Sequence, residues 1–271
     1  MQDGFCWNLD GIATRPDSGV DDVNQGVVMG TIDIQYRFGL SAETVHEIDI
    51  HLDPTSLNRV AIDSSALPDW TNLENEQCVH CPLTPDNHPH CPVAMGLTEI
   101  IQNLDGIVSF DEIDLEVITE ERRVTQHTTA QRAISSLLGL LMATSGCPHT
   151  AFFKPMARFH LPLASEENTI YRAAGMYLLA QFFLKKESLT SDPGLHGLRK
   201  IYENMHIVNL HIAKRLKSAT VTDSSVNAIV LLDSFTNTLP YVIEDHLDEI
   251  SYLFSAYHTE NYQQLLQESE D

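Results

Sequence analysis

The sequence predicts an α+β fold, in which a small N-terminal antiparallel sheet packs against a mostly helical C-terminal region. Apolar and polar residues alternate strictly in residues 31–38 and 46–52, which is typical of strands with one wet face. From Thr128 onward the apolar residues instead recur at helical spacing, in several stretches long enough for buried or amphipathic helices. These two periodicities place the sheet before the helices along the chain.

Three strands are expected. The first alternates Ile32, Ile34, Tyr36 and Phe38 with polar residues, and the second follows after a short link at 39–45, which indicates a hairpin. A third strand is predicted over residues 113–117.

The helices are predicted from apolar stripes and their end signals. Pro92 suits the first turn of a helix over 93–104, and Gly146 suits the end of an apolar, fully buried helix over 129–144. Ser165 is a plausible N-cap for a second buried helix. The remaining helices are expected over residues 165–185, 196–217, 223 to near Pro240, and 243–257, before an acidic tail expected to fray over 263–271.

These elements suggest four parts. A loose lead-in occupies residues 1–25, and a β-rich part with a cysteine loop (70–92) and one helix occupies 26–125. The helical region covers 126–258, and an acidic tail follows over 259–271.

The amino-acid composition excludes some classes of binding partner but assigns no function. The chain has 38 acidic and 16 basic residues and a formal net charge of −22, so nucleic acid and anionic membrane surfaces are poor partners. A protein partner remains open. The first residues lack a basic region followed by an apolar run, and no apolar stretch is long enough to span a bilayer, so a cytoplasmic location is expected.

Four of the five cysteines suggest one site. Cys78 and Cys81 form a Cys-x-x-Cys pair, Cys91 ends a loop rich in proline and histidine, and Cys147 follows the first buried helix. Thiolates bind zinc or an iron–sulfur cluster, and cysteines in a reducing compartment favour such use over disulfides. The sequence therefore predicts a metal centre that joins the β-rich part to the helical region, and Cys6 is expected to be an unpaired thiol.

The ligand pattern leaves the metal open. A closed zinc site is slightly favoured, a [4Fe–4S] cluster is the alternative, and His90 or His149 could replace one cysteine. A third reading is thiol–disulfide chemistry at Cys78 and Cys81, although no βαβ context surrounds them.

If the protein is an enzyme, the candidate catalytic residues are His149, Arg158 and His160, in a proline-rich segment after Cys147. Alternatively, this segment is a rigid connector without a catalytic role, and its polar residues form hydrogen bonds to the backbone. Glu203 and His206 match half of a di-iron motif, but no second helical copy is present. The sequence names no substrate.

Four short motifs also carry a resemblance. Cys-x-x-Cys-Pro-Leu, Cys-Pro-Val-Ala, Ser-Gly-Cys-Pro and Pro-Met-Ala-Arg-Phe-His-Leu-Pro lie between Trp70 and Phe183. With the preceding Ile-x-Tyr-x-Phe strand, they resemble an uncharacterised family of bacterial proteins without an assigned activity. The resemblance implies a bacterial origin and supplies no substrate or catalytic residue. The function expected from the residues is a cytoplasmic metal-binding protein with a binding or interaction role. The alternatives are an iron–sulfur or other metal-dependent redox enzyme, and a thiol–disulfide redox protein that uses Cys78 and Cys81.

Overall fold

A computed structural model describes residues 30–41, 44–60, 67–104, 106–220 and 223–268 of the chain. Its sheet contains β1 (Ile32–Gly39), β2 (Val45–Leu52), β3 (Glu112–Thr119) and β4 (Arg123–Thr129) in the antiparallel order β2-β1-β3-β4. The register places Tyr36 opposite Ile48 and Val117, so the apolar residues of neighbouring strands share one face. The predicted hairpin and third strand are confirmed. Cys6 and the predicted lead-in over 1–25 lie outside the described residues.

The structure adds β4, which the sequence analysis missed. Thr128 is the one residue of this strand that is fully buried, because β4 lies at the edge of the sheet and pairs with β3 alone. An edge strand with little buried surface gives no clear alternation of apolar and polar residues.

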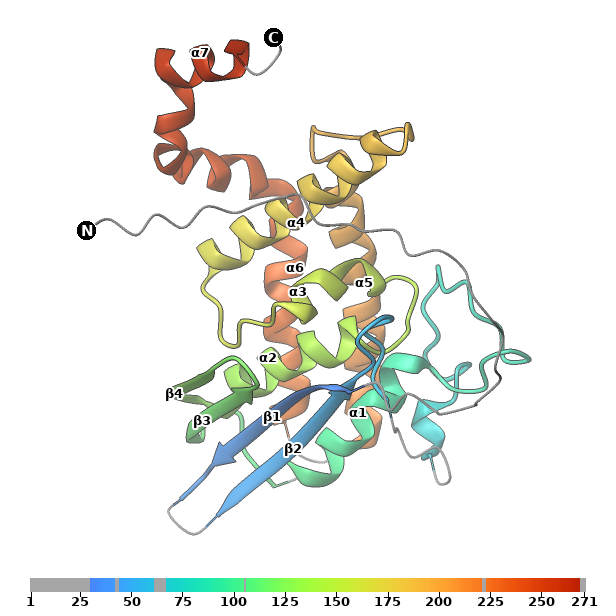
Figure 1. Ribbon diagram of the computed structural model, residues 1–271. Coiled ribbons are helices and arrows are strands. Elements are labelled where there is room, and N and C mark those ends of the chain that lie inside the picture. The colour runs from blue at the N-terminus through green and yellow to red at the C-terminus, as the bar shows by residue number, and fades with distance from the viewer. Residues whose placement is uncertain (1–29, 42–43, 61–66, 105, 221–222, 269–271) are drawn as a thin grey trace, which may run out of the picture.

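Helices make up the rest of the molecule, and they stack away from the sheet toward the C-terminus (Figure 1). The α+β prediction is therefore confirmed. In chain order, the helices are α1 (Pro92–Asn103), α2 (Ala130–Ala143), α3 (Lys154–Arg158), α4 (Glu166–Lys186), α5 (His196–Ala219), α6 (Ser224–Glu249) and α7 (Glu260–Glu268), with short 3-10 segments η1 (Asp69–Thr71), η2 (Ala151–Phe153) and η3 (Ser251–His258).

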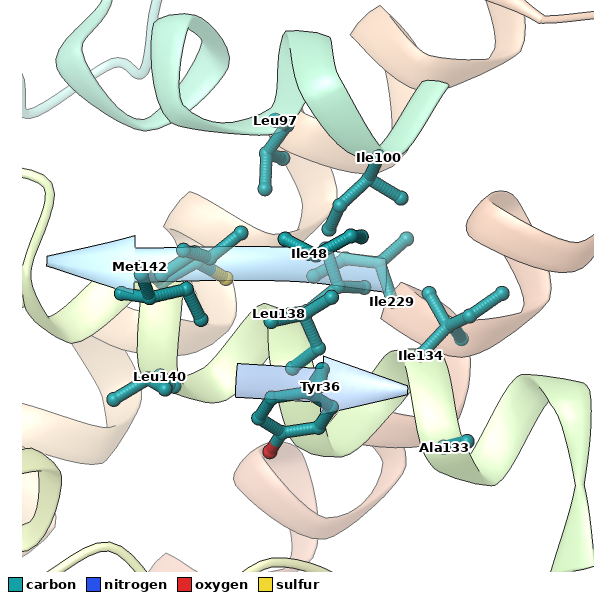
Figure 2. Close-up of a cluster of buried hydrophobic side chains, with 14 of the residues drawn as sticks. Tyr36, Ile48, Leu97, Ile100, Ala133, Ile134, Leu138, Leu140, Met142 and Ile229 are labelled. Atoms are coloured by element: carbon teal, nitrogen blue, oxygen red, sulfur yellow. The ribbon is translucent and has the colours of Figure 1, made fainter. Parts of the chain in front are cut away.

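The main core lies between the inner face of the sheet and helices α1, α2, α5 and α6. Figure 2 shows Tyr36 and Ile48 of the sheet beside Leu138 of α2, with Leu97 of α1 and Ile229 of α6 close by. Nearly every side of α2 is buried, as its sequence predicts. This helix therefore joins the sheet layer to the helical layer.

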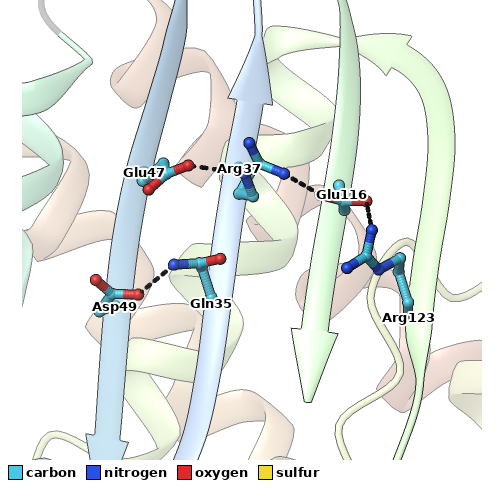
Figure 3. A network of polar contacts seen from close by, with 6 residues as sticks. All are labelled: Gln35, Arg37, Glu47, Asp49, Glu116 and Arg123. Carbon is cyan, nitrogen blue, oxygen red and sulfur yellow. Dashed lines mark hydrogen bonds and ion pairs between the residues drawn. The ribbon is translucent and has the colours of Figure 1, made fainter.

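The opposite face of the sheet is polar. Arg37 donates to Glu47 at 2.8 Å and to Glu116 at 2.6 Å, and Arg123 donates to Glu116 at 2.9 Å (Figure 3). Such cross-strand pairs between half-exposed side chains contribute little net stability, but they keep opposite charges in register.

The predicted helix end near Pro240 is wrong, because α6 continues through this proline to Glu249. Leu239 and Ile243, on either side of it, are both 1% exposed and pack in a second core cluster with α4 and α5. Burial of both halves against the same neighbours offsets the hydrogen bond that proline cannot donate. The predicted helix over 243–257 is therefore split between the end of α6 and η3.

Two further expectations need correction. The predicted second buried helix, α4, buries only residues near its start, while Leu179, Phe182 and Phe183 are each more than half exposed. The predicted frayed tail forms α7 as far as Glu268. Within the described residues, no helix combines the length and the hydropathy that crossing a membrane requires.

The division into a buried and a polar sheet face predicts unequal effects of two substitutions. Leu138→Ala removes a fully buried side chain between the sheet and α6 and should cost about 2–5 kcal/mol of unfolding free energy. Arg37→Ala removes ion pairs on the polar face and should cost much less. Urea denaturation of both variants checks this expectation, and a larger loss in Arg37→Ala would contradict the assignment of the two faces.

Candidate functional site

The four cysteines predicted to form one site come from three places in the fold. Cys78 and Cys81 lie in one turn, closed by a hydrogen bond from the Cys81 N–H to the Cys78 carbonyl at 3.0 Å. Cys91 is the N-cap residue of α1, where the helix dipole favours a negative charge. Cys147 follows the end of α2 and is 8% exposed. All four are free thiols, and together they are called the thiol cluster below.

The fold brings these thiols into one neighbourhood. Burial raises the pKa of Cys78 to about 12, and negative charge on Cys91, Cys147 and Cys81 adds to the rise. Charges interact in this way only over short distances. Cys147, although far from the other three along the chain, belongs to the core cluster against which Cys78 and Cys91 pack.

The thiol cluster does not have the arrangement of a coordination sphere. Across the described ranges, no group of three or more histidine, cysteine, aspartate or glutamate side chains is placed to hold a metal ion. The ligand assignment made from the sequence thus remains a prediction, as do zinc and [4Fe–4S].

Arg215 is the residue at this site that the sequence analysis did not single out. Its guanidinium is 2% exposed and donates to the carbonyls of Trp70, Asn72 and Leu73 at 2.7–2.9 Å. Its positive charge lowers the pKa of Cys78, against the effect of burial. The sequence does contain a signal for the burial of Arg215. This residue lies at helical spacing from Ile212, on the apolar stripe of α5, which faces the core.

Backbone groups also face the cluster. Burial raises the pKa of Cys147, and the backbone N–H groups of His149 and Thr150 oppose that rise. Hydrogen bonds from N–H groups stabilise a thiolate more than a thiol. The turn after α2 is therefore built to accept negative charge on the Cys147 sulfur.

The two histidines proposed as substitute ligands have other contacts. His90 Nδ1 lies 2.8 Å from Thr71 Oγ1. His149 stacks on His80 with ring centroids 3.9 Å apart, and its Nε2 lies 3.0 Å from the His80 carbonyl oxygen. Burial, and then the charge of His149, lowers the pKa of His80. These contacts fix both rings without use of a metal.

The three candidate catalytic residues do not form one constellation. Arg158 is exposed, with its guanidinium carbon 5.4 Å from the centre of the Phe159 ring. His149 is held against His80, whereas His160 Nε2 lies 2.6 Å from the Tyr36 hydroxyl. Among the described residues, no hydrogen bond joins any two of the three. The half di-iron motif is also accounted for, because His206 pairs with Asp233 at 2.9 Å.

His160 lines a second feature, a partly open cavity of about 340 Å³ between helices α2 to α6, called the central cavity below. Burial lowers the pKa of His160 to about 3, and the positive charge of Arg172 contributes to the shift. The imidazole is therefore neutral at physiological pH, and its Nε2 can accept from Tyr36. The Tyr36 hydroxyl also lies 3.1 Å from Ser136 Oγ.

This neutral imidazole predicts a pH dependence of stability. The unfolded chain binds a proton at His160 below a pKa of about 6.5, whereas the folded chain resists protonation down to about pH 3. Stability should therefore fall between those limits as pH decreases, by up to about 1.4 kcal/mol per pH unit from this residue. His160→Gln, which keeps an acceptor for Tyr36, should lose less stability between pH 7 and pH 4.5 in urea denaturation. Equal losses in both proteins would contradict the buried neutral imidazole.

The comparisons with known proteins identify a family and no activity. A family model described as a domain of unknown function, DUF6901, matches residues 34–255, which include the sheet, the thiol cluster and the central cavity. No curated protein and no solved structure shows significant similarity to this chain. The match agrees with the resemblance to an uncharacterised family, and the bacterial origin stays a prediction. The chain belongs to the DUF6901 family.

Proposed function

We propose that this protein binds a metal centre through Cys78, Cys81, Cys91 and Cys147, and that the centre fastens the cysteine loop to the end of α2. The observation that supports this most is that Cys78 and Cys91 pack against the core cluster that contains Cys147, with all four cysteines free and the Arg215 guanidinium buried. A zinc ion would draw the four sulfurs inward until each lay about 2.3 Å from the metal. In a [4Fe–4S] cluster, each sulfur would instead bind one iron.

Charge balance explains why Arg215 belongs in this proposal. Zinc with four thiolates carries two net negative charges, and so does an oxidised [4Fe–4S] cluster with four thiolates. Arg215 donates its side-chain hydrogen bonds to three carbonyl groups and forms no ion pair with a carboxylate among the described residues, so its positive charge is available to the centre. A buried charge without an opposite charge is costly, which favours a negative centre next to it.

Four thiolates are a better donor set here than three thiolates and one histidine. His90 and His149 both make contacts that hold their rings elsewhere. We favour zinc as a structural metal slightly over [4Fe–4S], because a closed site of this kind stabilises a fold without requiring an electron partner.

Thiol–disulfide exchange at Cys78 and Cys81 is the weaker alternative. The nucleophile in that chemistry is a thiolate, and burial raises the pKa of Cys78 to about 12. At neutral pH this sulfur is a protonated thiol, which suits it to metal-driven deprotonation more than to attack on a disulfide.

The biological role that accompanies this centre is proposed to be the binding of a protein partner in the cytoplasm, where thiols stay reduced. Its support is an apolar surface at the C-terminal half of α4, where Leu178, Leu179, Phe182 and Phe183 are exposed. Clustered exposed aromatic and aliphatic side chains are typical of interaction surfaces.

Substitution of one cysteine tests the centre. Protein purified without oxygen should contain about one zinc ion per chain, or iron with inorganic sulfide and a brown colour. Cys147→Ser should lose that metal and melt at a lower temperature, because the link between the loop and α2 is broken. Cys6→Ser, which changes a thiol outside the predicted cluster, should keep both metal and stability. Wild-type protein without metal would overturn the proposal and promote the thiol–disulfide alternative.

Substitution of Arg215 tests the charge balance. Arg215→Met leaves three buried carbonyls without a donor and should cost about 3 kcal/mol or more. The Arg215→Met variant should also lose its metal to a chelator faster than the wild type. Arg215→Lys keeps the positive charge, so it should lose the metal more slowly than Arg215→Met. Lys214→Met removes a neighbouring surface charge and serves as the control. Equal metal retention in Met and Lys variants would restrict Arg215 to a structural role.

A further inference from the structure

The central cavity is a separate feature from the thiol cluster, and its walls are mostly apolar. Its lining includes Leu140 and Met142 of α2, Leu232 and Phe235 of α6, and Met156 of α3. Its volume of about 340 Å³ lies at the small end of the range of ligand-binding cavities, which is about 300–1,000 Å³. A small apolar group would fit such a space.

One end of the cavity holds a cation whose hydrogen bonds are incomplete. Arg172 donates from Nη2 to the carbonyls of Met156 at 3.0 Å and Phe159 at 2.7 Å. An arginine has five N–H donors, so the three on Nη1 and Nε remain available. No carboxylate among the described residues forms an ion pair with Arg172.

The surroundings of Arg172 increase its need for an anion. Burial lowers the pKa of Arg172, and the positive charge of Arg122 adds to the shift. Arg132, at the cavity wall, is exposed and also has no ion-pair partner among the described residues. The acidic residue of the wall, Glu166, lies 3.5 Å from His246 instead. In a chain with a net charge of −22, this end of the cavity is locally positive.

Two neutral groups complete the polar end. Tyr202 is 4% exposed, lines the cavity, and its hydroxyl has no hydrogen-bond partner among the described residues. Arg172 and Tyr202 both line this cavity. The neutral His160 ring lies on the same wall. A carboxylate could therefore accept hydrogen bonds from Arg172 and Tyr202.

We propose that the central cavity binds a small apolar monocarboxylate, with its carboxylate on Arg172 and Tyr202 and its apolar body among the side chains of α2 and α6. The inference rests on the cavity alone and does not depend on a metal in the thiol cluster. A neutral or cationic molecule of the same shape would leave Arg172 without its anion and so would bind less well.

The glycine at position 139 allows the cavity to be filled without a change in the backbone. Gly139 lines the cavity from the middle of α2, and a Cβ added there would meet no atom within 4 Å. Gly175 of α4 has the same free space but does not line the cavity. Gly139→Leu and Gly175→Leu therefore form a matched pair, and both exchanges also remove a helix-weakening glycine.

Calorimetric titration of the purified full-length protein with decanoate tests the proposal, and decanol and decylamine serve as neutral and cationic probes. Decanoate should bind at least about tenfold more tightly than either. Arg172→Gln should weaken decanoate binding by about tenfold or more and leave decanol unchanged. Gly139→Leu should abolish decanoate binding, whereas Gly175→Leu should retain it.

Circular dichroism and thermal melting show whether each variant is folded, and the Gly139 pair provides a test even if Arg172→Gln is unstable. Three results would overturn the proposal. The first is that neither decanoate nor the aromatic probe 1-naphthoate gives a heat of binding at millimolar concentration. The second is equal affinity for decanoate and decanol. The third is unchanged decanoate binding in folded Gly139→Leu.

Discussion

The burial of α2 on all sides is the constraint on which the rest of the structure depends. Its side chains pack against the inner face of the sheet, against α1 and against α6, so the sheet and the helical layer share one core. A helix that is apolar all round cannot face water, and its position therefore fixes the layers on both sides. Both candidate sites are positioned by this one helix. Cys147 follows its C-terminus, and Gly139, Leu140 and Met142 form one wall of the central cavity.

Arg215 makes a similar connection on the other side of the molecule. It reaches from α5 to the segment that leads into the cysteine loop, and three carbonyls of that segment accept its hydrogen bonds. The loop has few apolar side chains with which to pack, so polar contacts such as these bonds and the stack of His80 on His149 hold it against the helices. A buried guanidinium next to four thiols is costly if the site stays neutral, and much less so if the site holds a negative centre.

The sequence predicted those parts of the fold in which burial and periodicity agree. β1, β2 and α2 have strong patterns because each residue faces either core or water in a regular order. β4 and the exposed half of α4 were misjudged for opposite reasons, since one is a strand with almost no buried face and the other has large apolar side chains that remain in water. Pro240 was read as a helix end, although tertiary packing on both sides of it outweighs the local preference.

The candidate functional sites were also only partly predictable from the sequence. The cysteines were identifiable from residue type and spacing, and Cys78 and Cys91 pack against the core cluster that contains Cys147, but their joint ligation stays a prediction. The spacing of Arg215 on α5 indicated its burial, but its carbonyl partners and the central cavity depend on which groups from distant segments meet, which spacing along one chain does not encode. His160 was selected for its place near Cys147 in the sequence, but in the structure it turns toward Tyr36 and the cavity.

The segment between Cys147 and Thr150 places the two candidate sites in contact. The Thr150 N–H group and hydroxyl both donate to the Cys147 carbonyl oxygen at 3.2 Å, and Thr150 also lies in the wall of the central cavity. A metal bound to the Cys147 sulfur would restrict the motion of this turn. The turn would then restrict the motion of the part of the cavity wall to which Thr150 belongs. Any effect of the metal on ligand binding must have a reciprocal effect of the ligand on metal binding, because the two equilibria share the same folded protein. Rigidity at the thiol cluster would therefore act on the cavity through a few backbone groups rather than through a change of fold.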